Sequence, residues 1–243
     1  ATAESFHSDL ESLKNQGLDL STITAFMIES YHGWGALFYS KEYIKAIRQW
    51  ANENQIIVIF DEIQSGFGRT GKLFAYEHYD VEADLVCCGK GISSGLPLSA
   101  VLGRKELIDV DPSLNSTHGG NPICCAATLA SLEVLQDENL ISESARKGLL
   151  LEKELIKIKN KYEDRIEIFG KGLVYAIHVK KSGTKEYDVE IVDRIIEKSM
   201  QKGVLLIRTG TGTIKIGPPL TIFDDALLEG VSVIDESISE CFS

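Results

Sequence analysis

The chain has 243 residues, enough to bury one large hydrophobic core or the cores of a large and a small domain. Hydrophobic residues make up 44% and charged residues 25% of the sequence, as in ordinary globular proteins. The formal net charge of -11 argues against nucleic acid or an anionic membrane surface as the main partner, and no apolar run approaches the length of a membrane span.

The sequence contains five cysteines, an odd number, and none has Cys-x-x-Cys or Cys/His spacing. Four of them form two adjacent pairs inside apolar segments. This pattern favours reduced, buried thiols in a cytoplasmic protein and argues against a zinc site.

The first half of the chain alternates apolar runs with helical sequence, which predicts an α/β fold with parallel strands. Residues 41–54 predict a helix, because Tyr43, Ile47, Trp50 and Ala51 recur at helical spacing. The predicted buried strands are residues 23–28, 56–60 and 85–88.

A polar residue stands after each predicted strand: Glu29, Asp61 and Lys90. Ligands of parallel α/β sheets bind beyond the carboxyl ends of the strands, so the three side chains are expected to converge. Lys90 lies between Gly89 and Gly91, and removal from solvent at a strand end would favour its neutral, nucleophilic amine, which can form a Schiff base with a carbonyl. A carboxylate such as Asp61 needs a cation there, although taken alone it also fits a residue that caps the next turn.

The second half changes character after Asn121-Pro122, a favourable helix start. Helical sequence continues to about residue 162, with a break near 137–139, and is followed by alternating short strands and helices. The predicted strands span 166–179 (two strands), 204–208 and 213–216, and the predicted helices span 188–202 and 224–238. We therefore expect a partial large domain at 1–135, a connecting helical segment at 136–162 and a small α+β domain at 163–243.

Two glycine-containing segments suggest ligand contacts. Residues 66–71 match the dinucleotide pattern G-x-G-x-x-G, but they do not directly follow a strand and no helix opens after them, so a turn in a pocket wall is the better interpretation. Residues 116–122, Ser-Thr-His-Gly-Gly-Asn-Pro, combine hydroxyls, glycines and a helix start. They suit a phosphate group, and a plain capped helix entry fits them equally well.

Together, four motifs in order resemble the class III pyridoxal-phosphate (PLP) aminotransferases, the ω-aminotransferase group of fold type I. They are residues 59–71 (Ile-Phe-Asp-Glu-Ile-Gln-Ser-Gly-Phe-Gly-Arg-Thr-Gly), 88–91 (Cys-Gly-Lys-Gly), 116–122 and 217–221 (Gly-Pro-Pro-Leu-Thr). The resemblance covers essentially the whole chain. It implies a mostly parallel sheet flanked by helices, a small C-terminal α+β domain, and PLP as cofactor.

The resemblance also implies a role for each matching residue. Lys90 would form a Schiff base with PLP and shuttle protons, and Asp61 would pair with the pyridine nitrogen. Ile63 would pack on the ring and Gln64 would approach the ring hydroxyl. The remaining implied positions are Thr117, for the phosphate in the neighbouring subunit of a homodimer, and Glu29 and Lys215, near the substrate.

Departures from the family pattern bear on the substrate and on completeness. Lys215 stands where many members have an arginine that grips a substrate carboxylate, a bidentate fork that lysine cannot copy. Ser30 replaces the usual proline after Glu29. The family's N-terminal part has no counterpart here, so we expect an incomplete fragment that is inactive on its own.

The leading hypothesis is PLP-dependent transamination between an amine or ω-amino acid and a keto acid or aldehyde. An aminomutase of the same fold group and a non-catalytic PLP-type scaffold remain open alternatives. Schiff-base chemistry without PLP fits less well, because Asp61 and the phosphate-type loop would then have no role.

Overall fold

The computed structural model describes residues 2–111, 113 and 115–242, which form two compact units. The first unit comprises Ala1–Tyr31, Tyr39–Phe67 and Lys72–Glu138. The second comprises His32–Phe38, Gly68–Gly71 and Asn139–Ser243. Two short segments from the first half of the chain therefore belong to the unit that the second half builds.

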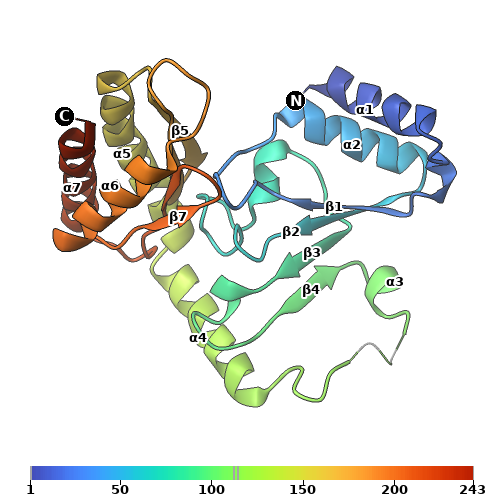
Figure 1. The fold of residues 1–243 in the computed structure, drawn as a ribbon. Coiled ribbons are helices and arrows are strands. Elements are labelled where there is room, and N and C mark those ends of the chain that lie inside the picture. Colours follow the sequence, from blue (N-terminus) through green and yellow to red (C-terminus); the bar gives the residue numbers. More distant parts are fainter. Residues whose placement is uncertain (1, 112, 114, 243) are drawn as a thin grey trace. The chain divides into compact units, whose positions relative to one another are not determined.

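The first unit is built on a four-stranded sheet in the order β1-β2-β3-β4 (Figure 1). The strands are β1 (Ala25–Glu29), β2 (Ile57–Asp61), β3 (Leu85–Cys88) and β4 (Ala100–Gly103). β1, β2 and β3 pair in parallel, as the sequence predicts, and β4 pairs antiparallel with β3. The sheet therefore has one edge at which three strands end.

Helices α1 (Ala3–Asn15) and α2 (Lys41–Glu53) lie side by side (Figure 1). Phe6 of α1 packs in edge-to-face contacts against Phe26, Tyr43 and Trp50, which joins both helices to β1. Such pairs add to the burial of apolar area. The remaining helical elements of this unit are η1 (Leu20–Thr22), η2 (Ala75–Tyr79), η3 (Lys90–Ile92), α3 (Lys105–Ile108) and α4 (Pro122–Asp137).

β1 differs from the buried strand that its apolar sequence predicts. Its residues alternate between exposed and half-buried, and Met27 is 64% exposed. Successive side chains of a strand point to opposite faces of the sheet: Phe26 packs against Phe6 and Trp50 of the two helices, whereas Met27 points to the other face. Strands β2 and β3 alternate between buried and half-buried residues.

The second unit has an antiparallel sheet in the order β5-β6-β8-β7, accompanied by three helices (Figure 1). The strands are β5 (Ile166–Lys171), β6 (Val174–Val179), β7 (Ile207–Thr209) and β8 (Thr213–Ile216). The helices are α5 (Leu140–Lys161), α6 (Val189–Gln201) and α7 (Asp224–Phe242). Every residue of β6 is buried, and Leu155, Ile177, Ile195 and Ile238 contribute to one core between sheet and helices.

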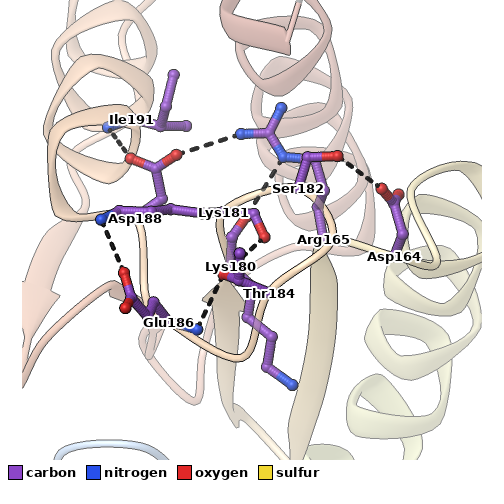
Figure 2. Close-up of polar contacts among 9 residues, drawn as sticks. All are labelled: Asp164, Arg165, Lys180, Lys181, Ser182, Thr184, Glu186, Asp188 and Ile191. Carbon is purple, nitrogen blue, oxygen red and sulfur yellow. Dashed lines mark hydrogen bonds and ion pairs between the residues drawn. The ribbon is translucent and has the colours of Figure 1, made fainter.

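The connection from β6 to α6 is fixed by polar contacts (Figure 2). Asp188 caps α6 by accepting a hydrogen bond from the Ile191 amide at 3.2 Å. The same carboxylate pairs with Arg165 at 3.3 Å, and Arg165 also donates to the Lys180 carbonyl. The guanidinium of Arg165 lies 3.7 Å from the centre of the Phe242 ring, so this arginine also ties the end of α7 to the sheet.

Over the described residues, no helix has the length and apolar character needed to cross a membrane.

Candidate functional site

The carboxyl ends of β1, β2 and β3 meet at one edge of the sheet, as the sequence predicts (Figure 1). In the strand register, Glu29 is the direct neighbour of Asp61, and Asp61 is the direct neighbour of Cys87. Burial and the negative charge of Asp61 both raise the pKa of the Cys87 thiol. The structure therefore brings Glu29 and Asp61 together on adjacent strands, with Lys90 three residues beyond Cys87.

Asp61 is half-buried, and its Oδ1 accepts a hydrogen bond from the Ile63 amide at 3.0 Å. In the described part of the chain, no lysine, arginine or histidine forms an ion pair with this carboxylate. A half-buried carboxylate without a cation is unfavourable unless a bound group supplies the positive charge. The arrangement thus fits a cationic ligand at the sheet edge.

Lys90 begins the single turn η3 and has a positive φ of 43°. A non-glycine residue in this left-handed region costs free energy, and such strain concentrates at functional sites. Its side chain is exposed, whereas the sequence predicts a lysine removed from solvent. The strand ends at Cys88 and Gly89 is still buried, so burial ends one residue before the lysine, which begins η3.

Ile63 and Gln64 occupy the turn that follows β2. A Cβ at Gly89 would lie 3.1 Å from Ile63 Cγ2, so the Ile63 side chain packs directly on the backbone that precedes Lys90. Gln64 is exposed, and its Oε1 accepts a hydrogen bond from the Tyr31 hydroxyl at 3.0 Å. The aromatic residue after Ser30 therefore contacts a predicted cofactor residue.

Thr117 lies in an exposed turn before α4. In that turn the Gly119 amide donates to the Ser116 carbonyl at 3.0 Å, and Asn121 caps the helix by accepting from the Ile123 amide. Within the described residues, no hydrogen bond joins Thr117 to Asp61, Gln64 or Lys90. The resemblance assigns Thr117 to the cofactor of a neighbouring subunit, so its role stays a prediction.

Lys215 belongs to β8 in the second unit, and its Nζ donates to the Gly33 carbonyl at 2.5 Å. The same segment, residues 32–38, is held by Nε2 of the buried His178, which lies 2.9 Å from the Gly35 carbonyl oxygen. Burial lowers the pKa of His178, so its neutral form is favoured and the tautomer that carries the proton on Nε2 donates this bond. The ammonium of Lys215 thus donates to the backbone, and it offers no bidentate contact of the kind that an arginine makes with a carboxylate.

A buried carboxylate that sequence analysis missed lies next to Asp61. Glu62 is completely buried, and its two carboxylate oxygens accept four hydrogen bonds. The donors are the Ser30 and Ser65 hydroxyls and the Ala75 and Tyr76 amides, at 2.5, 2.6, 2.9 and 2.8 Å. A charged residue in a polar turn is expected to be solvated, and the sequence alone shows only that a serine stands at position 30 where the family pattern has proline.

Residues 66–71 form turns and open no helix, which confirms that they are not a dinucleotide-binding motif. Arg69 carries their best-defined contacts: its Nη1 donates to the Leu173 carbonyl at 2.9 Å and to the Pro218 carbonyl at 2.6 Å. Two of the four sequence motifs are therefore joined directly within the second unit.

Arg69→Ala should lower the free energy of unfolding by about 2 kcal/mol, because it leaves two carbonyl acceptors without their charged donor. Arg208→Ala is the matched control, since that exposed arginine makes a surface ion pair with Asp193 and should change stability by less than about 1 kcal/mol. Denaturant unfolding of both variants measures the difference. Equal effects would contradict the role given to Arg69.

No group of three or more histidine, cysteine, aspartate or glutamate side chains with metal-site geometry occurs within residues 2–111, 113 and 115–242.

Comparison with known proteins identifies the class. Residues 1–238 match the family model "Aminotransferase class-III". The chain is 37% identical over 223 residues to a 4-aminobutyrate aminotransferase of Mycobacterium tuberculosis, covering 88% of this chain and 49% of that protein. It is 32% identical over 240 residues to an acetylornithine aminotransferase of Synechocystis, covering 96% and 55%.

The fold agrees with solved structures of the same class. A transaminase from the marine bacterium Virgibacillus superimposes with a TM-score of 0.88 at 28% identity, covering 99% of this chain and 58% of that one. The chain belongs to the class III aminotransferases, a PLP-dependent family. It spans about half the length of the curated relatives it matches.

The residues at the sheet edge fit PLP by their chemistry. The Asp61 carboxylate, which forms no ion pair among the described residues, suits a protonated ring nitrogen, and the exposed Lys90 suits an aldehyde. Ile63 places an apolar side chain against Gly89, the residue before Lys90.

Proposed function

We propose that the whole protein is a PLP-dependent transaminase that moves an amino group from an amine or ω-amino acid to a keto acid or aldehyde. The observation that supports this most strongly is the register that sets Glu29 beside Asp61 at the strand ends, with Lys90 on a strained turn after the next strand. The names of the similar proteins, which act on 4-aminobutyrate and acetylornithine, agree with amino-group transfer.

When bound, PLP supplies an aldehyde that bonds to amines and a ring that accepts electrons. In our proposal, Lys90 would hold the cofactor through its amine and would move a proton at the substrate carbon. The negative charge of Asp61, which forms no ion pair among the described residues, would favour a proton on the ring nitrogen. Ile63 would pack on the ring and Gln64 would bind the ring hydroxyl.

The substrate side is assigned to Glu29 and Lys215. Glu29 is exposed at the end of β1, where a substrate amine or polar group can approach it. Lys215 would act near the substrate by holding the Gly33 carbonyl through a hydrogen bond. Because lysine cannot bind a carboxylate in the bidentate manner of arginine, this assignment favours substrates that need no such contact.

We further propose a homodimer in which Thr117 binds the phosphate of the cofactor in the neighbouring subunit. Helix α4, which follows Thr117, is mostly apolar, and its Ile123, Leu129 and Val134 are 72%, 62% and 44% exposed. An apolar helix of this kind is normally covered, and a second subunit would cover it. Free thiols at all five cysteines support a cytoplasmic location.

The proposed domains are a PLP-binding domain within 1–135, a connecting segment at 136–162 and a small domain at 163–243. This division differs from the two compact units in that it leaves residues 32–38 and 68–71 with the large domain, although both segments pack with the second half of the chain.

Lys90→Ala tests the central assignment. The chain is incubated with PLP, reduced with borohydride and mapped by peptide mass. We expect one cofactor per chain on Lys90 and none on the peptide of the variant, because Lys90 lies just beyond β3, the strand that pairs with Asp61. Lys105→Ala, which removes an exposed lysine of α3, is the control and should label as the wild type does. Labelling spread over surface lysines, or absent from Lys90, would contradict the proposal.

A further inference from the structure

The ends of β1 and β2 are joined by a buried link that does not belong to the sheet. Ser30, directly after Glu29, donates from its hydroxyl to Glu62 Oε1 at 2.5 Å. Glu62 directly follows Asp61. Ser30 and Glu62 are both completely buried, so water does not compete for this hydrogen bond.

The other partners of Glu62 make the link rigid. The Ala75 and Tyr76 amides of η2 donate to its carboxylate, one to each oxygen. The Tyr79 hydroxyl of the same element donates to the Ser30 carbonyl at 2.5 Å. Residue 30 is therefore held through both its side chain and its backbone, and one carboxylate is the common point of three chain segments.

Hydrogen-bond donors stabilise the buried Glu62 carboxylate. Burial raises the pKa of Glu62, while the four hydrogen bonds oppose that shift by stabilising the charged form. Within the described residues, no lysine, arginine or histidine forms an ion pair with Glu62, so the hydrogen bonds are what compensate its burial. Removing one donor leaves a buried carboxylate oxygen undersatisfied, and the segment that the lost hydrogen bond held to the carboxylate is then freer to move.

We propose that Glu62, acting through Ser30, is a positioning residue that fixes Glu29 relative to Asp61. The link spans the two strands at the residues directly after this pair, where the last rungs of the parallel ladder would otherwise fray. The inference rests on the proposed function only for the use of these two carboxylates, because the link itself is a property of the chain without cofactor.

Ser30→Ala and Ser65→Ala form a matched pair for the test. Each removes one hydroxyl donor from Glu62, but Ser65 lies on the same turn as Glu62, where its hydroxyl also makes a long contact of 3.5 Å with the Asp61 carbonyl, and within the described residues it forms no hydrogen bond with β1. Both variants should therefore lower the denaturation midpoint by similar amounts. Only Ser30→Ala should loosen the register of Glu29 and Asp61.

The first readout needs no cofactor. Hydrogen exchange at the backbone amides of residues 28–31 and 61–63 should quicken about tenfold in Ser30→Ala, the factor expected for a lost hydrogen bond to a buried carboxylate, and stay near the wild-type rate in Ser65→Ala. The second readout is the rate of borohydride-trapped labelling of Lys90 by PLP, which should fall in Ser30→Ala and change little in Ser65→Ala.

The two readouts separate the possible failures. Hydrogen exchange could quicken only in Ser30→Ala while the wild-type chain shows no PLP labelling at Lys90. That result would uphold the link and overturn the proposed function. Lys90 labelling in all variants, with the two serine variants equal in both readouts, would overturn the link and uphold the function. Glu62→Gln, which turns one acceptor into a donor facing other donors, should exceed Ser30→Ala in both readouts, and a smaller effect would also overturn the link.

Discussion

Asp61→Asn in the complete enzyme should lower the turnover number on the order of 10²–10³-fold, the loss typical of removing one preorganised electrostatic group from an active site. The reason is charge. Asparagine retains an oxygen that can accept from the Ile63 amide, so the turn after β2 should persist. It provides no anion, and the proton on the ring nitrogen would lose the group that holds it.

Asp80→Asn is the control for this experiment. Asp80 is an exposed residue whose ion pairs with Lys41 and Lys45 lie at the surface, so its loss should change stability by less than about 1 kcal/mol and leave turnover unchanged. Turnover and PLP binding are measured for both variants. If Asp61→Asn binds PLP normally and keeps wild-type turnover, Asp61 does not act on the ring nitrogen.

Local signals predict much of this fold. The apolar runs of β2 and β3 and the periodicity of α2 lie within single segments, and the break between α4 and α5 follows from Asp137-Glu138-Asn139. β4 was missed because its four residues, Ala-Val-Leu-Gly, have no polar alternation and follow a turn-rich stretch. α1 is not among the predicted elements, although Phe6, Leu10 and Leu13 recur at helical spacing in its thirteen residues; three apolar positions among polar residues are a weak signal.

The candidate site also contains some residues that local sequence predicts and some contacts that it does not. Glu29, Asp61 and Lys90 could be placed from sequence, because parallel strands bring their carboxyl ends to one edge without further information. The Ser30–Glu62 link joins residues 32 positions apart, and the contact of Lys215 with Gly33 joins residues 182 positions apart. Neither pairing has a local pattern, so only the folded chain reveals them.

The attachment of residues 68–71 to the second unit depends on a close backbone crossing. Gly172, in the turn between β5 and β6, has a φ of 57°, and a Cβ there would lie 2.3 Å from the Thr70 carbonyl carbon and 2.7 Å from the Gly71 nitrogen. Gly172→Ala should therefore lower the free energy of unfolding by about 2–5 kcal/mol, of which about 1–2 reflects the left-handed backbone and the rest overpacking. Denaturant unfolding measures the loss.

Gly183→Ala separates these two contributions. Gly183 also has a left-handed backbone, with a φ of 69°, but a Cβ there would meet nothing within 4 Å. This variant should lose only the conformational cost of about 1–2 kcal/mol. The difference in unfolding free energy between the two variants then measures the backbone crossing alone.

Hydrogen exchange gives a second, local readout. The Leu173 amide donates to the Arg69 carbonyl at 2.9 Å beside this crossing, so Gly172→Ala should speed hydrogen exchange at Leu173, whereas Gly183→Ala should not. Equal losses of stability in both variants would mean that residues 68–71 can shift away from the added methyl group with no loss of unfolding free energy. The close crossing would then not be what holds residues 68–71 in the second unit.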